Sequence, residues 1–139
     1  MSARVKARKR ALDAVFAADI RKISPLLLLD DVAVLTSDRQ NQEEIFSYAR
    51  TIVQGIVDHH DEIDDLLETY SHGWSLDRMP HLDRAILRVA VWEILFNPEV
   101  PDGVAVNEAV ELAKELSTDD SGAFVNGLLS RISSTNKPQ

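Results

Sequence analysis

The stretch that decides the fold is HLDRAILRVAVWEILF, from His81 to Phe96. Placed on a helix, its apolar residues surround much of the circumference instead of forming one stripe; they are Leu82, Ala85, Ile86, Val89, Ala90, Ile94 and Leu95. A helix that is apolar on most sides is typical of a buried, central position. Asn97-Pro98 ends it, because proline cannot continue a helix. We therefore expect the other segments to pack around this one.

Segments on both sides of this stretch also have apolar residues at helical spacing. The expected helices cover residues 4–20, 26–35, 45–56, 63–70, 102–116 and 119–132. Ser24-Pro25 is a typical cap and first turn for the second of them, and the polar stretch 37–42 is interpreted as a loop. We find no convincing alternating strand and no internal repeat. The sequence thus predicts an all-α fold with about seven helices around a shared core.

Length and composition narrow the class of protein further. A chain of 139 residues predicts one domain, which we place at residues 1–133, with a disordered tail at 134–139. The absence of cysteine excludes disulfides and thiolate zinc sites. The longest apolar run is too short to span a bilayer, and the N-terminus lacks the apolar core of a signal peptide. We expect a soluble cytoplasmic protein.

Charge is distributed unevenly along the chain, whose net charge is −8. The first ten residues contain no acid and five cations, which are Arg4, Lys6, Arg8, Lys9 and Arg10. All 23 acidic residues and the other 10 basic ones follow, a balance of −13. This asymmetry indicates a basic arm for a polyanion on an acidic body that does not coat nucleic acid indiscriminately. The other interpretation is a solvated, basic helix start.

Signals for catalysis or metal binding are weak. His59 and His60 lie beside several acids, but adjacent histidines point about 100° apart on a helix, and no pair of histidines has the i, i+4 spacing of a zinc helix. A solvated helix end explains them better. The sequence also lacks a phosphate-binding loop, a dinucleotide fingerprint and a nucleophile elbow. We expect neither an enzyme nor a metal or cofactor site.

Three stretches carry a resemblance to a known family. They are ARKRAL at residues 7–12, LDRMPHLDRAILRVAVWEIL at 76–95, and NEAVELAK at 107–114 continued by DSGAFVNGLL at 120–129. In this order, over most of the chain, they resemble the NusB family of bacterial transcription antitermination factors. The match is weak over residues 23–42, where only the helical periodicity supports a structure.

The resemblance implies both a fold and a function. Proteins of this family are all-helical and consist of two three-helix bundles around a shared core. They bind the single-stranded boxA element of nascent RNA together with NusE, which is also a protein of the small ribosomal subunit. The pair joins a complex on RNA polymerase that suppresses premature termination, notably in ribosomal RNA operons. No cofactor and no catalytic step are implied.

The resemblance also assigns roles to individual residues. The arm cations Arg4, Lys6, Arg8, Lys9 and Arg10 would bind RNA. Phe124 lies off its helix's apolar stripe and would stack on a base, whereas its ordinary role would be packing between helices. Phe16, Asp77 and Asp83 match positions that face NusE, with Phe16 where the family often has tyrosine. Core packing for Phe16, and a solvated face or local ion pairs for the two acids, are the alternatives.

Two further questions stay open at the level of the sequence. The first is whether the protein is instead a protein-only helical adaptor whose basic arm is incidental. The second is self-association, because the apolar stripe of the first helix is compatible with a homodimer as well as with another partner. Trp74, just before Asp77, either covers the core or lines the same surface as Asp77, and we expect it to cover the core.

Overall fold

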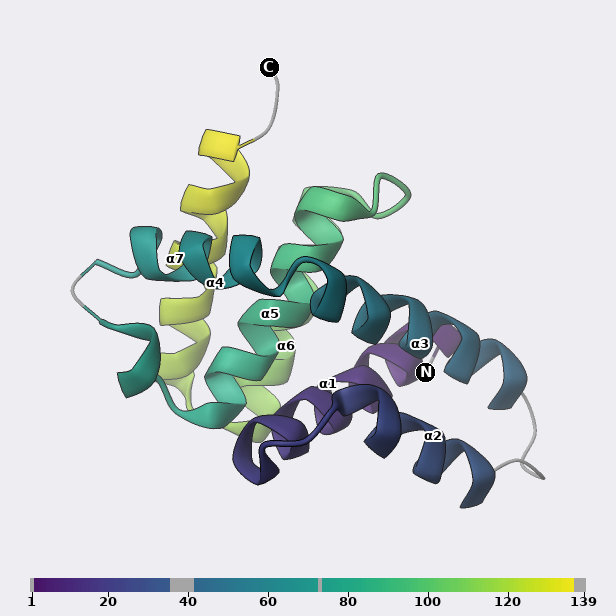
Figure 1. The fold of residues 1–139 in the computed structure, drawn as a ribbon. Helices are drawn as coiled ribbons and strands as arrows, with labels where there is room; N and C mark the ends of the chain where they lie inside the picture. Colours follow the sequence, from purple (N-terminus) through teal and green to yellow (C-terminus); the bar gives the residue numbers. More distant parts are fainter. Residues whose placement is uncertain (1, 36–41, 73, 137–139) are drawn as a thin grey trace.

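Helix α5 (His81–Phe96) runs through the middle of the fold, with the other helices around it (Figure 1). A computed structural model of the protein describes residues 2–35, 42–72 and 74–136. Within those residues every regular element is helical. The others are α1 (Ala3–Arg21), α2 (Pro25–Leu35), α3 (Gln42–Asp58), α4 (His60–Tyr70), the short 3₁₀ helix η1 (Leu76–Arg78), α6 (Asp102–Leu116) and α7 (Asp119–Asn136).

Two groups of helices share α5. Helices α1, α2 and α3 pack against one another, and α5, α6 and α7 form a second bundle, with α4 resting on α5 and α7. Helix α5 also contacts α1 and α3, which joins the groups. Twelve of its sixteen residues are buried, as expected for a helix that is apolar on most sides. The predicted all-α fold with two bundles around a shared core is confirmed.

The boundaries of the first two helices follow from local chemistry. The Ser2 hydroxyl accepts a hydrogen bond from the Val5 amide at 3.1 Å, which caps α1. Lys22 ends α1 in a left-handed conformation with φ 59°, and its amide donates to the Ala18 carbonyl. The predicted start of α2 at Ser24-Pro25 is also confirmed, because Ser24 Oγ accepts from the Leu26 amide at 3.3 Å.

Two expectations about irregular segments have different outcomes. Residues 134–136, predicted as part of a disordered tail, continue α7 instead. The physical reason is an anchor at this end: buried Ile132, and a 2.5 Å hydrogen bond from Ser133 Oγ to Asp102 Oδ2 of α6. Of the predicted loop, residues 37–41 lie outside the described residues, and Gln42 already begins α3.

Helices α3 and α5 come together where α3 has no side chain. A Cβ atom added to Gly55 would overlap the indole ring of Trp92, which is buried on α5. The glycine therefore makes room for the largest side chain of the central helix. No helix in the described ranges is long and apolar enough to cross a membrane.

Candidate nucleic-acid interface

The N-terminal half of α1 presents most of its cations to solvent. Arg4 and Lys6 are exposed, and Lys9 and Arg10 are partly exposed. No ion pair joins Lys6 to an acid in the described part of the chain. Because α1 packs against α3 and α5 along its length, these cations lie on a helix that is already formed. A polyanion that binds here does not have to order the backbone first.

Arg8 departs from the expectation for the arm. It is 5% exposed, and its Nε donates a hydrogen bond of 2.8 Å to Oε1 of Glu93, which is 1% exposed. The Tyr48 hydroxyl donates to the other oxygen of Glu93 at 2.6 Å. Burial and this hydrogen bond raise the pKa of Tyr48 to about 12. The Arg8 guanidinium thus ties α1 to α5 inside the protein instead of facing solvent.

A signal for this burial exists in the sequence. Arg8 lies one helical turn before Ala11 and Leu12, which are both buried, so it belongs to the apolar stripe of α1. Glu93 is likewise an acid within an otherwise apolar stretch of α5. Buried charges of opposite sign on two neighbouring helices are expected to pair. Because Arg8 is one of five cations in the first ten residues, it was grouped with the exposed ones, although it faces inward.

Three of the other cations have weak partners on the surface. The Arg4 guanidinium lies 4.1 Å from the centre of the Tyr48 ring, and its Nη2 lies 3.1 Å from Oε2 of Glu99. Lys9 Nζ lies 3.2 Å from Glu115 Oε1, and the Arg10 guanidinium lies 5.8 Å from the centre of the Phe46 ring. Exposed pairs of this kind contribute little free energy. A phosphate can therefore replace the carboxylates at low cost.

Phe124 and Trp74 form an aromatic pair between α7 and the connector before η1. Phe124 is half-buried and packs on the core, and its ring centre lies 5.0 Å from that of Trp74 at an angle of 57°. Trp74 is 44% exposed. The prediction that Trp74 covers the core was wrong, because its indole rests on Phe124 at the surface. The alternative expectation for Trp74 was the surface around Asp77, and no RNA contact was assigned to it.

The two acids predicted to face NusE differ in exposure. Asp77 is exposed in η1. Asp83 is 2% exposed, and its Oδ2 accepts a hydrogen bond of 3.0 Å from Ser121 Oγ, while its buried Oδ1 has no hydrogen-bond partner among the described residues. Asp83 was expected to face NusE as a surface charge, but it is buried. It joins the start of α5 to the first turns of α7.

A charged cluster brings the second half of α1 next to η1. Oδ2 of Asp19 lies 2.9 Å from His81 Nδ1 and accepts a 2.8 Å hydrogen bond from Arg84 Nε, while Arg84 Nη1 donates to the Leu76 carbonyl at 2.8 Å. Burial raises the pKa of Asp19, but these donors outweigh it and the net shift is downward. These contacts join α1 at Asp19 to η1, the element that contains Asp77, and Phe16 lies half-buried one turn before Asp19.

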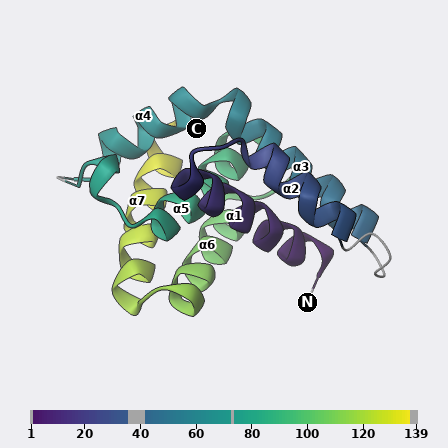
Figure 2. The ribbon, with the colours of Figure 1, turned by 60° about the horizontal axis from the view of Figure 1, so that its bottom comes forward.

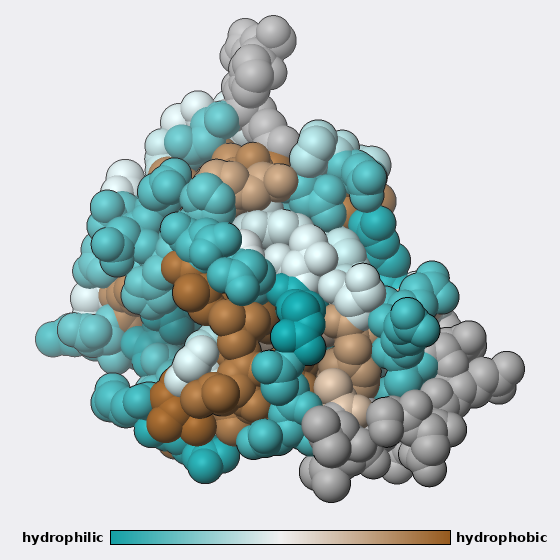
Figure 3. Space-filling view, turned by 45° about the vertical axis from the view of Figure 1, so that its right-hand side comes forward, coloured by the Kyte–Doolittle hydropathy of each residue, from teal (hydrophilic) through white to brown (hydrophobic). Residues whose placement is uncertain are grey.

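An exposed apolar surface lies beside the arm. Figure 3 shows apolar residues gathered in a patch on the face that carries α2. The large exposed apolar side chains at the end of α1 and on α2 are Ile20, Ile23, Leu27 and Val32. Arg10 and Val32 line the same cavity of about 220 Å³ between α1 and α2. The basic arm thus borders a surface suited to a protein contact.

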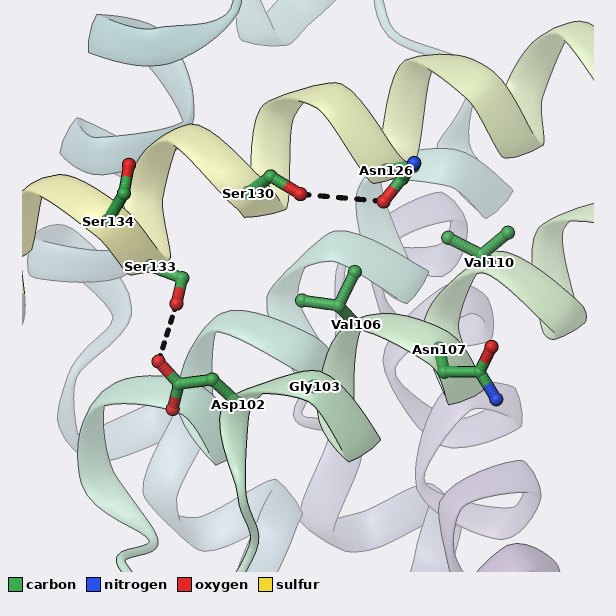
Figure 4. A pocket seen from close by; sticks show the side chains of 9 residues that line it. All are labelled: Asp102, Gly103, Val106, Asn107, Val110, Asn126, Ser130, Ser133 and Ser134. Carbon is green, nitrogen blue, oxygen red and sulfur yellow. Dashed lines mark hydrogen bonds between the residues drawn. The ribbon is translucent and has the colours of Figure 1, made fainter.

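A larger groove between α6 and α7 is uncharged except at one end. It has a volume of about 470 Å³, and Val106 and Val110 face Asn126 and three serine hydroxyls across it (Figure 4). Asp102 is its one charged lining residue. Two of its polar pairs are internal, Ser133 with Asp102 and Ser130 with Asn126. None of the residues predicted to bind RNA or NusE lines this groove.

Both the sequence and the fold are similar to those of known proteins. The NusB family matches residues 5–134. Transcription antitermination protein NusB of Leifsonia xyli subsp. xyli (strain CTCB07) is 57% identical over 139 residues, covering 100% of this chain and 96% of the relative. The protein of the same name from Clavibacter sepedonicus is 57% identical over 135 residues, covering 95% and 96%.

Two solved structures have the same fold. T. maritima NusB has a TM-score of 0.87 at 34% identity, covering 97% of this chain and 93% of that one. A chain from the crystal structure of antitermination factors NusB and NusE in complex with dsRNA has a TM-score of 0.85 at 30% identity, covering 96% and 98%. On its fold and its sequence along nearly the whole length, this chain belongs to the NusB family.

Proposed function

We propose that this protein is a transcription antitermination factor that binds boxA RNA together with NusE in the cytoplasm. The bound pair joins the antitermination complex on RNA polymerase, notably in ribosomal RNA operons. The protein acts by binding alone, with no cofactor and no catalytic step. Its relatives are transcription antitermination proteins, and one matched structure contains NusB, NusE and RNA, which supports this assignment.

The observation that carries the proposal is a preformed cationic helix on an acidic body. Arg4, Lys6, Lys9 and Arg10 reach the surface of α1, whereas the rest of the chain is strongly acidic. Cations that displace counterions from phosphates supply most of the affinity for nucleic acid. Arg8 supports this surface from inside, by holding α1 against α5. RNA is thus directed to α1 and away from the acidic remainder.

We also propose where NusE docks. Phe16 lies one turn before Asp19, which Arg84 connects to η1, the element that contains Asp77. A ribosomal protein is expected to be basic, and an exposed carboxylate attracts such a partner. Asp83 contributes indirectly, by tying this region through Ser121 to the start of α7.

The experiment removes the exposed arm cations and spares the buried one. A Lys6→Ala, Lys9→Ala, Arg10→Ala variant should bind single-stranded boxA RNA more weakly. Three fewer phosphate contacts should also make the slope of log affinity against log salt shallower by about 2. Fluorescence anisotropy of labelled RNA over a salt series measures both quantities.

A matched control removes three cations elsewhere. The variant Arg21→Ala, Lys22→Ala, Arg50→Ala has the same net charge, but its changes lie at the far end of α1 and on α3. It should keep nearly the wild-type slope. If both triple variants behave alike, general charge and not the arm attracts RNA. If the wild type binds NusE but no RNA, the protein is a protein-only adaptor.

A further inference from the structure

The ring of Trp74 is partly exposed on the connector between α4 and η1. The Trp74 backbone carbonyl accepts a hydrogen bond from the Ser71 hydroxyl. The residue before Ser71 is Tyr70, and its carbonyl accepts hydrogen bonds from Nε and Nη2 of Arg131 on α7, at 3.1 and 2.8 Å. These hydrogen bonds join Trp74 to Ser71, and the end of α4 to α7. A large apolar ring that is 44% exposed and packs against Phe124 is available to contact a ligand.

Helices α6 and α7 lie between the arm and this ring. Lys9 of α1 reaches Glu115 in the last turn of α6. The neighbouring residue Lys114 lies over α7, where its Cγ would be 2.9 Å from a Cβ on Gly122. Two residues further along α7, Phe124 contacts Trp74. Figure 2 shows α6 and α7 side by side, and these two helices pack against each other.

We propose that Trp74 is a second base-stacking residue for single-stranded RNA, beside Phe124. This inference rests on the proposed function and extends its RNA surface beyond the arm. Indole presents the largest π face of any side chain, and a base stacks on an aromatic ring regardless of its sequence. The tilted contact with Phe124 supports the indole from one side. RNA leaving the arm cations over Lys114 meets the two rings in succession.

The segment that carries Trp74, from Ser71 to Leu76, has no acidic residue of its own. The nearest downstream charges are Asp77 and Arg78, one of each sign, and α7 begins with Asp119 and Asp120 before it reaches Phe124. RNA that reaches the two rings therefore depends on nearby cations to offset these acids. Lys114 supplies a cation on the approach from the arm.

The test uses the full-length protein and labelled single-stranded boxA RNA. Trp74→Ala should weaken RNA binding roughly 5- to 150-fold, the usual range for losing one stacked base. Trp74→Phe keeps an aromatic face and should lose much less. Intrinsic fluorescence gives an independent signal, because the other tryptophan, Trp92, is 6% exposed. RNA should quench the emission of the wild type and not that of Trp74→Phe.

The control is Val104→Ala, which removes an equally exposed apolar side chain on α6, 45% exposed in the protein. It should bind RNA as the wild type does. Urea denaturation confirms that each variant is folded at the assay temperature. The inference is overturned if folded Trp74→Ala keeps wild-type RNA affinity, or loses NusE affinity only. In those cases the arm variant still weakens RNA binding, whereas failure of the proposed function would leave the wild type without RNA affinity.

Discussion

At the scale of single residues, the ion pair between Arg8 and Glu93 has the largest expected effect on stability. Both groups are almost fully buried, and Glu93 also accepts from Tyr48. Arg8→Ala would leave a buried carboxylate with only a neutral partner. We expect a loss of about 3–5 kcal/mol in the free energy of unfolding, measured by urea denaturation.

The neighbouring exposed cation provides the comparison for Arg8. Lys6→Ala removes the same charge from the surface and should change stability by less than about 0.5 kcal/mol. Equal stability of the two variants would show that the Arg8 guanidinium is not buried against Glu93. This contrast also explains why the RNA-binding variant spares Arg8: weaker binding after its loss would report unfolding as well as lost phosphate contact.

At the scale of helices, the crossing of α3 and α5 depends on the missing side chain of Gly55. Gly55→Ala would force the Trp92 ring or α3 itself to move, because the new Cβ would overlap the indole. Overpacking of this kind costs about 1–3 kcal/mol, which outweighs the gain in helix propensity. Thermal or urea denaturation should therefore detect a less stable protein.

A second helical glycine gives the opposite expectation. Gly103 in the first turn of α6 has no heavy atom within 4 Å of the position of a Cβ. Gly103→Ala should leave stability unchanged or raise it by up to about 1 kcal/mol. If Gly55→Ala were also stabilising, the close packing of α3 on α5 would be disproved.

At the scale of the whole molecule, the charge distribution predicts cooperation between partners. The balance of −13 outside the first ten residues repels RNA wherever the arm does not reach. A basic NusE docked near Asp77 would cover part of that charge. We expect NusE to tighten RNA binding and RNA to tighten NusE binding by the same factor, about 5- to 150-fold. Isothermal titration in both orders measures the two factors.

The structure also selects the variant that tests the docking region. Asp77→Lys changes an exposed charge and should weaken NusE binding while leaving the fold intact. Asp83→Lys would instead place a positive charge in a buried position, so a loss of NusE binding could not be separated from unfolding. Equal RNA affinity with and without saturating NusE would contradict the cooperative mechanism.

The helices, the central place of α5 and the family were all predictable from the sequence. These features depend on local spacing: apolar residues every three or four positions define a helix face, and apolar residues on most sides define a buried helix. The boundary at Ser24-Pro25 was predictable for the same reason, because capping involves residues within one turn. The end of α7 was not, since its anchor Asp102 lies 31 residues away from Ser133.

Which of several chemically similar residues are available for function depends on the packing of distant segments. Arg8 and Lys9 are adjacent in the sequence, yet Arg8 is buried because its partner Glu93 comes from a helix 85 residues further along. Asp83 and Asp77 differ in the same way: Asp83 is buried and accepts a hydrogen bond from Ser121 of α7, whereas Asp77 is exposed. Trp74 contacts Phe124 of α7, from a segment 50 residues further along, and remains 44% exposed. Burial is a property of contacts between distant segments, and periodicity within one segment does not contain that information.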